Sequence, residues 1–119
     1  MGTTSIKRLE PGTRQIENFK LEITGKKNLR FNGELLAKGD TKRNGSSTWK
    51  NYALFRTVGS VYILYCENIT IWQGEQDKYE VLVRGSREEL QSWYDNEERI
   101  HDSLKVMLSE YIEVDEVIE

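Results

Sequence analysis

The feature that most constrains the fold of this chain is a change of hydrophobic period near residue 85. Between residues 29 and 83, apolar and polar side chains alternate over several runs, with turn-forming residues between the runs. After that point Ser86 is followed three residues later by Glu89, and an apolar stripe begins at helical spacing with Leu90. Period-two alternation is typical of strands, and Ser-x-x-Glu before an apolar run is a capping box. The sequence therefore predicts strands first and a helix from Ser86 onward.

The predicted strands are separated by turns and by a longer polar loop over residues 38–47. The predicted spans are Gln15–Ile23, Leu29–Leu35, Thr48–Val58, Val61–Trp72 and Tyr79–Val83. Gly33 is expected to mark a bulge, and the run from Val61 to Cys66 is apolar on both faces, which indicates a central strand. Consecutive strands followed by helix predict an α+β fold, an antiparallel β-meander packed against a C-terminal helix.

Both ends of the chain are expected to differ from the central domain. Residues 1–14 contain Pro11-Gly12 and several small polar residues, and are predicted to form an arm before a single domain over residues 15–119. Asp95-Asn96 are expected to interrupt the helical stripe, and residues 112–119 alternate again, as an edge strand or an acidic tail would. No apolar run reaches the ~20 residues of a membrane span, and no secretory signal is present, so we expect a soluble cytoplasmic protein.

The charges are distributed unevenly along the chain. Residues 1–56 carry 12 Lys/Arg and 5 Asp/Glu, whereas residues 57–119 carry 5 Lys/Arg and 15 Asp/Glu, so a net charge of −3 divides into +7 and −10. Such halves either pair their charges across the fold or face separate charged partners. Although basic residues and aromatics are interleaved in the first half, alternation places Phe31 opposite Arg30, and the pI is about 5.3. We therefore do not expect nucleic-acid binding.

Catalytic chemistry has little support in the sequence. The single cysteine, Cys66, excludes an internal disulfide and a cysteine-based zinc cluster, and the single histidine, His101, excludes a multi-histidine metal site. Cys66 lies in the most apolar predicted strand, and no spacing aligns His101 with it. Carboxylates near turns allow the hypothesis of an enzyme that uses carboxylates, but it ranks third, behind the two binding hypotheses given below. The prediction is that the protein is not an enzyme.

Calcium fits the residue inventory better, because it binds carboxylate, amide and carbonyl oxygens and needs neither His nor Cys. The loop starting at Asp40 places Asn44 at the fifth position of an EF-hand-like loop, but Lys42 replaces the ligand of the third position and Asn51 stands at the twelfth. This loop is therefore not an EF-hand. A different Ca²⁺ site is predicted, in which Asp40 and Asn44 combine with carboxylates of the turn at residues 73–77. The predicted ligands are Asp40, Asn44, Glu75 and Asp77.

Two resemblances follow from these features. In its size, acidic second half, central antiparallel strands and turn carboxylates, the chain resembles the small cyanobacterial calcium-binding regulators of heterocyst differentiation. That resemblance implies a protein that binds calcium reversibly and controls its availability. The segment Arg30–Leu36, together with Phe55–Thr57, is also similar to small uncharacterised bacterial proteins of plasmid or phage type, which implies no chemistry.

The sequence thus leaves two leading hypotheses. The first is a calcium-binding regulatory or buffering protein. The alternative is a charged protein-interaction module, for instance one encoded by a plasmid or phage, that binds or inhibits a partner protein.

Overall fold

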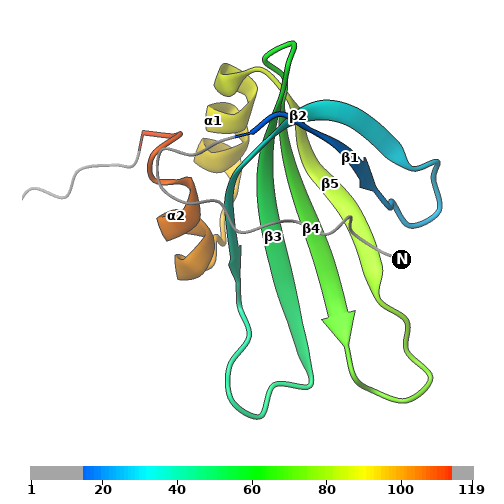
Figure 1. Ribbon diagram of the computed structural model, residues 1–119. Coiled ribbons are helices and arrows are strands. Elements are labelled where there is room, and N and C mark those ends of the chain that lie inside the picture. The colour runs from blue at the N-terminus through cyan, green and yellow to red at the C-terminus, as the bar shows by residue number, and fades with distance from the viewer. Residues whose placement is uncertain (1–14, 114–119) are drawn as a thin grey trace, which may run out of the picture.

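The computed structural model describes residues 15–113, which form one curled antiparallel sheet and two helices (Figure 1). The five strands follow one another in the sheet in the order of the sequence, so the predicted meander and the α+β class are confirmed. The strands are β1 (Glu17–Leu21), β2 (Leu29–Asp40), β3 (Thr48–Thr57), β4 (Tyr62–Thr70) and β5 (Lys78–Gly85). The helices are α1 (Arg87–Asn96) and α2 (Asp102–Leu108).

Strand β2 is longer than the sequence indicates. The segment Lys38–Asp40, expected in a loop, continues the ladder with β3, where Gly39 lies opposite Tyr52. Gly33 is paired in register on both sides, and the register shift falls between Leu35 and Ala37, so the expectation of a bulge at Gly33 is wrong. The polar composition of this stretch gave no sign that pairing with β3 would hold it extended.

The two central strands separate two apolar cores. On one face, the side chains of β1 pack against Phe55, Ile63 and Tyr65. On the other face, residues of both helices pack against Leu54 and Leu64. The apolar stretch of β4 is buried on both faces, which confirms the prediction that it is central.

The first strand folds back over its face of the sheet. Phe19 contacts Phe31 and Phe55, with ring centroids 5.5 and 4.9 Å away. Beyond β1, the backbone N–H of Thr24 donates to the carbonyl of Tyr79 on β5 at 2.9 Å, and the N–H of Tyr79 donates to the Thr24 hydroxyl at 2.7 Å. The chain segment after the first strand therefore contacts the last strand, and the sheet curls around the aromatic core.

The helical region begins as predicted and divides in two. The Ser86 hydroxyl accepts a hydrogen bond from the N–H of Glu89 at 3.2 Å, as expected for the capping box. The helix stops at Asn96, since Glu97 has an extended backbone, and a second helix starts after His101. The predicted interruption at Asp95-Asn96 is therefore confirmed, and the connection over residues 97–101 separates α1 from α2.

The predicted arm at residues 1–14 and most of the predicted strand or tail at 112–119 lie outside the described residues. Within residues 15–113, neither helix has the length and apolarity that a membrane crossing requires.

Among the described residues, Glu34 is the only charged side chain that is buried. Its carboxylate accepts a hydrogen bond from the guanidinium of Arg56 on the neighbouring strand, and this contact is the largest cause of the raised pKa of Arg56. A buried carboxylate is tolerated only with such a partner. The pair therefore also fixes the register of β2 against β3.

A matched pair of glycine substitutions tests the packing of β2. A Cβ at Gly33 would clash with the carbonyl oxygen of Arg56 and lie 2.9 Å from the Cα of Thr57, whereas a Cβ at Gly39 would meet Met107 at 3.6 Å, an ordinary contact. We expect Gly33→Ala to lower the free energy of unfolding by about 1–3 kcal/mol. Gly39→Ala should change it by less than about 0.5 kcal/mol. Urea denaturation followed by circular dichroism measures both, and equal effects would contradict the prediction.

Candidate functional site

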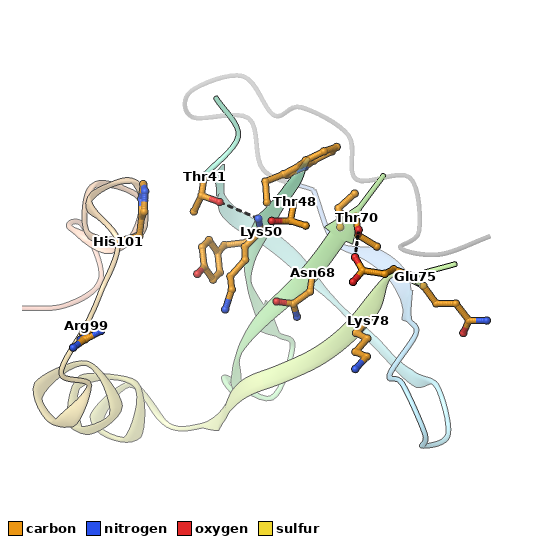
Figure 2. Close-up of a pocket in the computed structure, with 13 residues that line it drawn as sticks. Thr41, Thr48, Lys50, Asn68, Thr70, Glu75, Lys78, Arg99 and His101 are labelled. Carbon is orange, nitrogen blue, oxygen red and sulfur yellow. Dashed lines mark hydrogen bonds between the residues drawn. The ribbon is translucent and has the colours of Figure 1, made fainter. Parts of the chain in front are cut away.

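A cleft of about 730 Å³ lies between the sheet and the connection from α1 to α2 (Figure 2). Its floor is formed by the ends of β3, β4 and β5 that lie nearest the β2–β3 and β4–β5 hairpins. Its other wall carries Arg99 and His101 from the connection between the helices. The residues that line it are Thr41, Thr48, Trp49, Lys50, Tyr52, Asn68, Ile69, Thr70, Glu75, Gln76, Lys78, Arg99 and His101.

The strand register places the polar side chains of the floor in rows. Lys50 on β3 is paired with Asn68 on β4, which in turn is paired with Lys78 on β5. Thr48 and Thr70 form the next paired row toward the hairpins. Because residues two apart on a strand share a face, both rows lie on the face that bears the buried Tyr52. Figure 2 shows Lys50, Asn68 and Lys78 side by side on that face.

The helices leave this end of the sheet uncovered. Helix α2 packs against β2, where the sulfur of Met107 lies 3.6 Å from a Cβ built on Gly39, and α1 packs against β5 and β4. Their buried side chains cover Leu54 and Leu64. Beyond the buried Tyr52 and Cys66, the side chains of this face become polar: Thr48, Lys50 and Lys78 are exposed, and Asn68 and Thr70 are half-buried. The cleft therefore begins where the apolar core ends.

His101 has a defined role at the start of α2. Its Nδ1 accepts a hydrogen bond from the backbone N–H of Ser103 at 3.1 Å and lies 2.8 Å from the Ser103 hydroxyl. Because Nδ1 acts as the helix cap, the proton of the neutral ring lies on Nε2. His101 therefore offers a hydrogen-bond donor in the wall of the cleft.

Hydrogen bonds fix the hairpin end of the cleft. The Thr70 hydroxyl donates to Glu75 at 2.7 Å and accepts from the N–H of Trp72 at 3.1 Å. The N–H of Thr70 donates to the carboxylate of Asp77 at 2.9 Å. On β3, the N–H of Lys50 donates to the Thr41 hydroxyl at 2.9 Å. The polar groups around the cleft are thus held in place by their neighbours.

The electrostatics of the cleft are dominated by cations. Arg56 is paired with Glu34, whereas Lys50, Lys78 and Arg99 form no ion pair with a carboxylate among residues 15–113. Beside the Lys50 row, the carboxylate of Glu80 accepts a hydrogen bond of 3.4 Å from Asn68. The cleft therefore presents three cationic groups and one Nε2–H donor, together with the carboxylate of Glu75 at its hairpin end.

Burial changes the ionisation of two groups, Tyr52 in the floor of the cleft and its strand partner Cys66. It raises the pKa of Tyr52 to about 12, with smaller contributions from Cys66, Glu80 and Glu97. It also raises the pKa of the Cys66 thiol to about 11, an effect that Lys50 opposes. Both groups are neutral at pH 7, so neither adds a negative charge to the cleft.

The four residues predicted to bind calcium lie in two hairpins at the same end of the sheet (Figure 1). Asp40 and Asn44 line a shallow depression in the β2–β3 loop, where the carboxylate of Asp40 accepts a hydrogen bond of 3.0 Å from the N–H of Lys42. Glu75 and Asp77 lie in the β4–β5 loop and contact Thr70. In the described part of the chain, no three carboxylate, His or Cys side chains form a group that could hold a metal ion. Calcium binding at these residues stays a prediction.

Sequence reasoning did not identify the cationic residues of the cleft. Lys50 lies in the basic first half of the chain, whereas Lys78 and Arg99 lie in the acidic second half. The positions of the hairpin turns in the sequence could have revealed two of these residues. When the predicted strands are aligned about their turns, Lys50 and Lys78 lie on either side of Asn68. Arg99 reaches the cleft only through the path of the connection between α1 and α2, which the spacing of residues in the sequence does not predict.

Comparison with protein-family models, with curated proteins and with solved structures finds no match to this chain.

The environment of Cys66 predicts slow thiol chemistry. The side chain is 1% exposed, and its raised pKa keeps the thiolate scarce at pH 8. We expect reaction with a thiol reagent such as DTNB to be at least about 100-fold slower in the folded protein than in 6 M guanidinium, with Cys66→Ser as the blank. The ordinary pKa of a cysteine thiol is 9.0, and the folded state disfavours the thiolate. As the pH rises above 9.0, ionisation of Cys66 in the unfolded chain therefore lowers the free energy of unfolding. Rapid stoichiometric labelling of the folded protein would contradict the prediction.

Proposed function

We propose that the protein binds an anionic small molecule in the cleft. The observation that carries the proposal is the convergence of Lys50, Lys78 and Arg99, which have no carboxylate partner among residues 15–113, on one concave site. Cations in a cleft with low-dielectric walls focus the electric field and raise the local concentration of anions. The Nε2–H of His101 adds a directional donor. Lys and Arg donors give charge-assisted hydrogen bonds with carboxylate or phosphate oxygens.

The size of the cleft supports a small ligand. Its volume of about 730 Å³ falls within the usual range for small-molecule sites, ~300–1,000 Å³. Buried Tyr52 supplies an apolar floor, while the threonines and Asn68 supply hydrogen bonds that orient a ligand. Such a mixture of apolar surface and a few placed polar groups is typical of binding sites.

The proposal is for binding without catalysis. Covalent catalysis needs an activated nucleophile beside a general base. Cys66 is buried with its pKa raised to about 11, and Nδ1 of His101 already caps α2. The chemistry that the described residues of the cleft support is recognition.

Charge-neutralising substitutions test the anion site. We expect phosphate, titrated by calorimetry at low ionic strength, to bind the unmodified protein, and each of Lys50→Gln and Lys78→Gln to weaken that binding about tenfold, or ~1.4 kcal/mol. Raising the salt to 0.15 M should weaken binding further, because exposed charges are screened over ~8 Å. Lys26→Gln is the control, since Lys26 is exposed in the turn before β2 and does not line the cleft. An equal loss in the control, or no binding at all, would refute the proposal.

Calcium regulation is the second candidate, and one observation favours it. On the other face of the sheet, the pKa of Glu67 is raised by burial and further by Asp77 and Glu22, while a hydrogen bond from Asn51 opposes the rise. The negative charges of Asp77 and Glu22 therefore oppose the ionisation of Glu67, and a bound cation would relieve that repulsion. Asp77 is one of the four ligands predicted from the sequence.

This candidate makes a separate prediction. If calcium is the ligand, millimolar calcium should raise the melting temperature by mass action, and magnesium should do so less, because flexible loops suit the larger ion. Asp77→Asn should reduce the shift while retaining an oxygen that can accept from Thr70, and Asp95→Asn on α1 is the matched control. An unchanged melting temperature with both ions would exclude calcium regulation.

A further inference from the structure

The polar surface of the cleft is divided into two groups with different chemistry. One group is cationic and consists of Lys50, Lys78 and Arg99 together with His101. The other lies toward the hairpins and consists of the hydroxyls of Thr48 and Thr70 and the carboxylate of Glu75. Figure 2 shows Glu75 beside Thr70, whereas Arg99 and His101 lie on the helical side.

The register sets the distance between the two groups. Thr48 precedes Lys50 by two residues, and Thr70 follows Asn68, the partner of Lys50, by two residues. A strand rises ~3.3 Å per residue, so the hydroxyl row lies ~7 Å from the Lys50 row along the sheet. This spacing suits one small molecule that has an anionic group at one end and several hydroxyl groups along its length.

The cationic group suits a phosphate better than a carboxylate. Two ammonium groups and one guanidinium supply three positive charges and many N–H donors. A phosphate monoester carries a charge of about −1.5 to −2 at pH 7 and has three acceptor oxygens, whereas a carboxylate carries one charge and two oxygens. The charge and the number of donors therefore match a phosphate monoester.

The second group suits hydroxyls. Glu75 already accepts a hydrogen bond from Thr70 at 2.7 Å, and a carboxylate has lone pairs for further donors. A ligand hydroxyl can donate to that carboxylate, but a second phosphate at this end would be repelled by it. The Thr48 side chain adds a hydroxyl that both donates and accepts. A polyol portion is the chemistry that satisfies these groups together.

We propose that the ligand of the cleft is a sugar phosphate, with its phosphate at Lys50, Lys78 and Arg99 and its hydroxyls at Thr48, Thr70 and Glu75. This inference rests on the proposed anion-binding function and specifies the class of ligand. It requires that the two groups act on the same molecule.

Calorimetry with three kinds of probe tests the inference. The probes are inorganic phosphate, three sugar phosphates (glucose 6-phosphate, fructose 6-phosphate and ribose 5-phosphate) and glucose alone. We expect at least one sugar phosphate to bind about tenfold or more tightly than inorganic phosphate, and glucose alone to give no detectable binding. If none of the three sugar phosphates binds the unmodified protein more tightly than inorganic phosphate does, the inference is overturned, while the proposed anion site stands.

Two variants separate the hydroxyl group from the cationic group. Glu75→Ala and Thr48→Val should each reduce the preference for the sugar phosphate over phosphate by about fivefold or more, with phosphate affinity kept or, for Glu75→Ala, increased. Glu110→Ala, which removes an exposed carboxylate that does not line the cleft, is the control and should leave the preference unchanged. Circular dichroism verifies that each variant is folded.

The outcomes distinguish this inference from the proposed function. An unchanged preference in both folded variants would overturn the sugar phosphate assignment alone. Absence of binding by phosphate and by every sugar phosphate would overturn the anion site and the inference with it.

Discussion

The structure depends on the burial of β3 and β4 on both of their faces. A strand pair of this kind needs apolar material above and below it, and the chain supplies β1 for one face and two short helices for the other. Fully burying a large apolar side chain contributes ~1.5–3 kcal/mol, so Phe55 and Ile63 on one face and Leu54 and Leu64 on the other outweigh any exposed polar contact. The curl of the sheet brings β1 over the face that the helices do not cover, and the bonds between Thr24 and Tyr79 hold it there.

The cleft exists because this coverage is incomplete. The helices cover the face up to Tyr52 and Cys66, and the strands continue beyond them toward the two hairpins. A sheet face that extends past its covering layer must carry polar side chains, since exposed apolar ones would favour association. In this protein those polar side chains include Lys50 and Lys78, and the connection after α1 faces them with Arg99. The same division that ends the core therefore creates the site.

The parts of the fold that depend on local pattern were predictable from the sequence. Alternation identified the strands and the Ser86 capping box identified the start of α1, because each reflects contacts between residues close in sequence. The end of β2 was missed, since Lys38–Asp40 is held extended by pairing with β3 and not by its own polar composition. The site was missed for a related reason. Lys50, Lys78 and Arg99 meet only after the strands pair and the helices dock, so their spacing in the sequence carries no periodic signal.

The net charge of the chain is a poor guide to the charge of its cleft. The pI of about 5.3 argues against an extended anionic partner such as nucleic acid, which senses the field of a whole surface. A small anion senses only groups within about a Debye length, ~8 Å at physiological salt. Lys50 from the basic half and Lys78 and Arg99 from the acidic half line the same cleft. An interaction module that relies on opposed charged halves stays a prediction. The proposed anion site does not require the two halves to face different partners, because its cations come from both of them. An acidic protein can therefore carry a site for an anion.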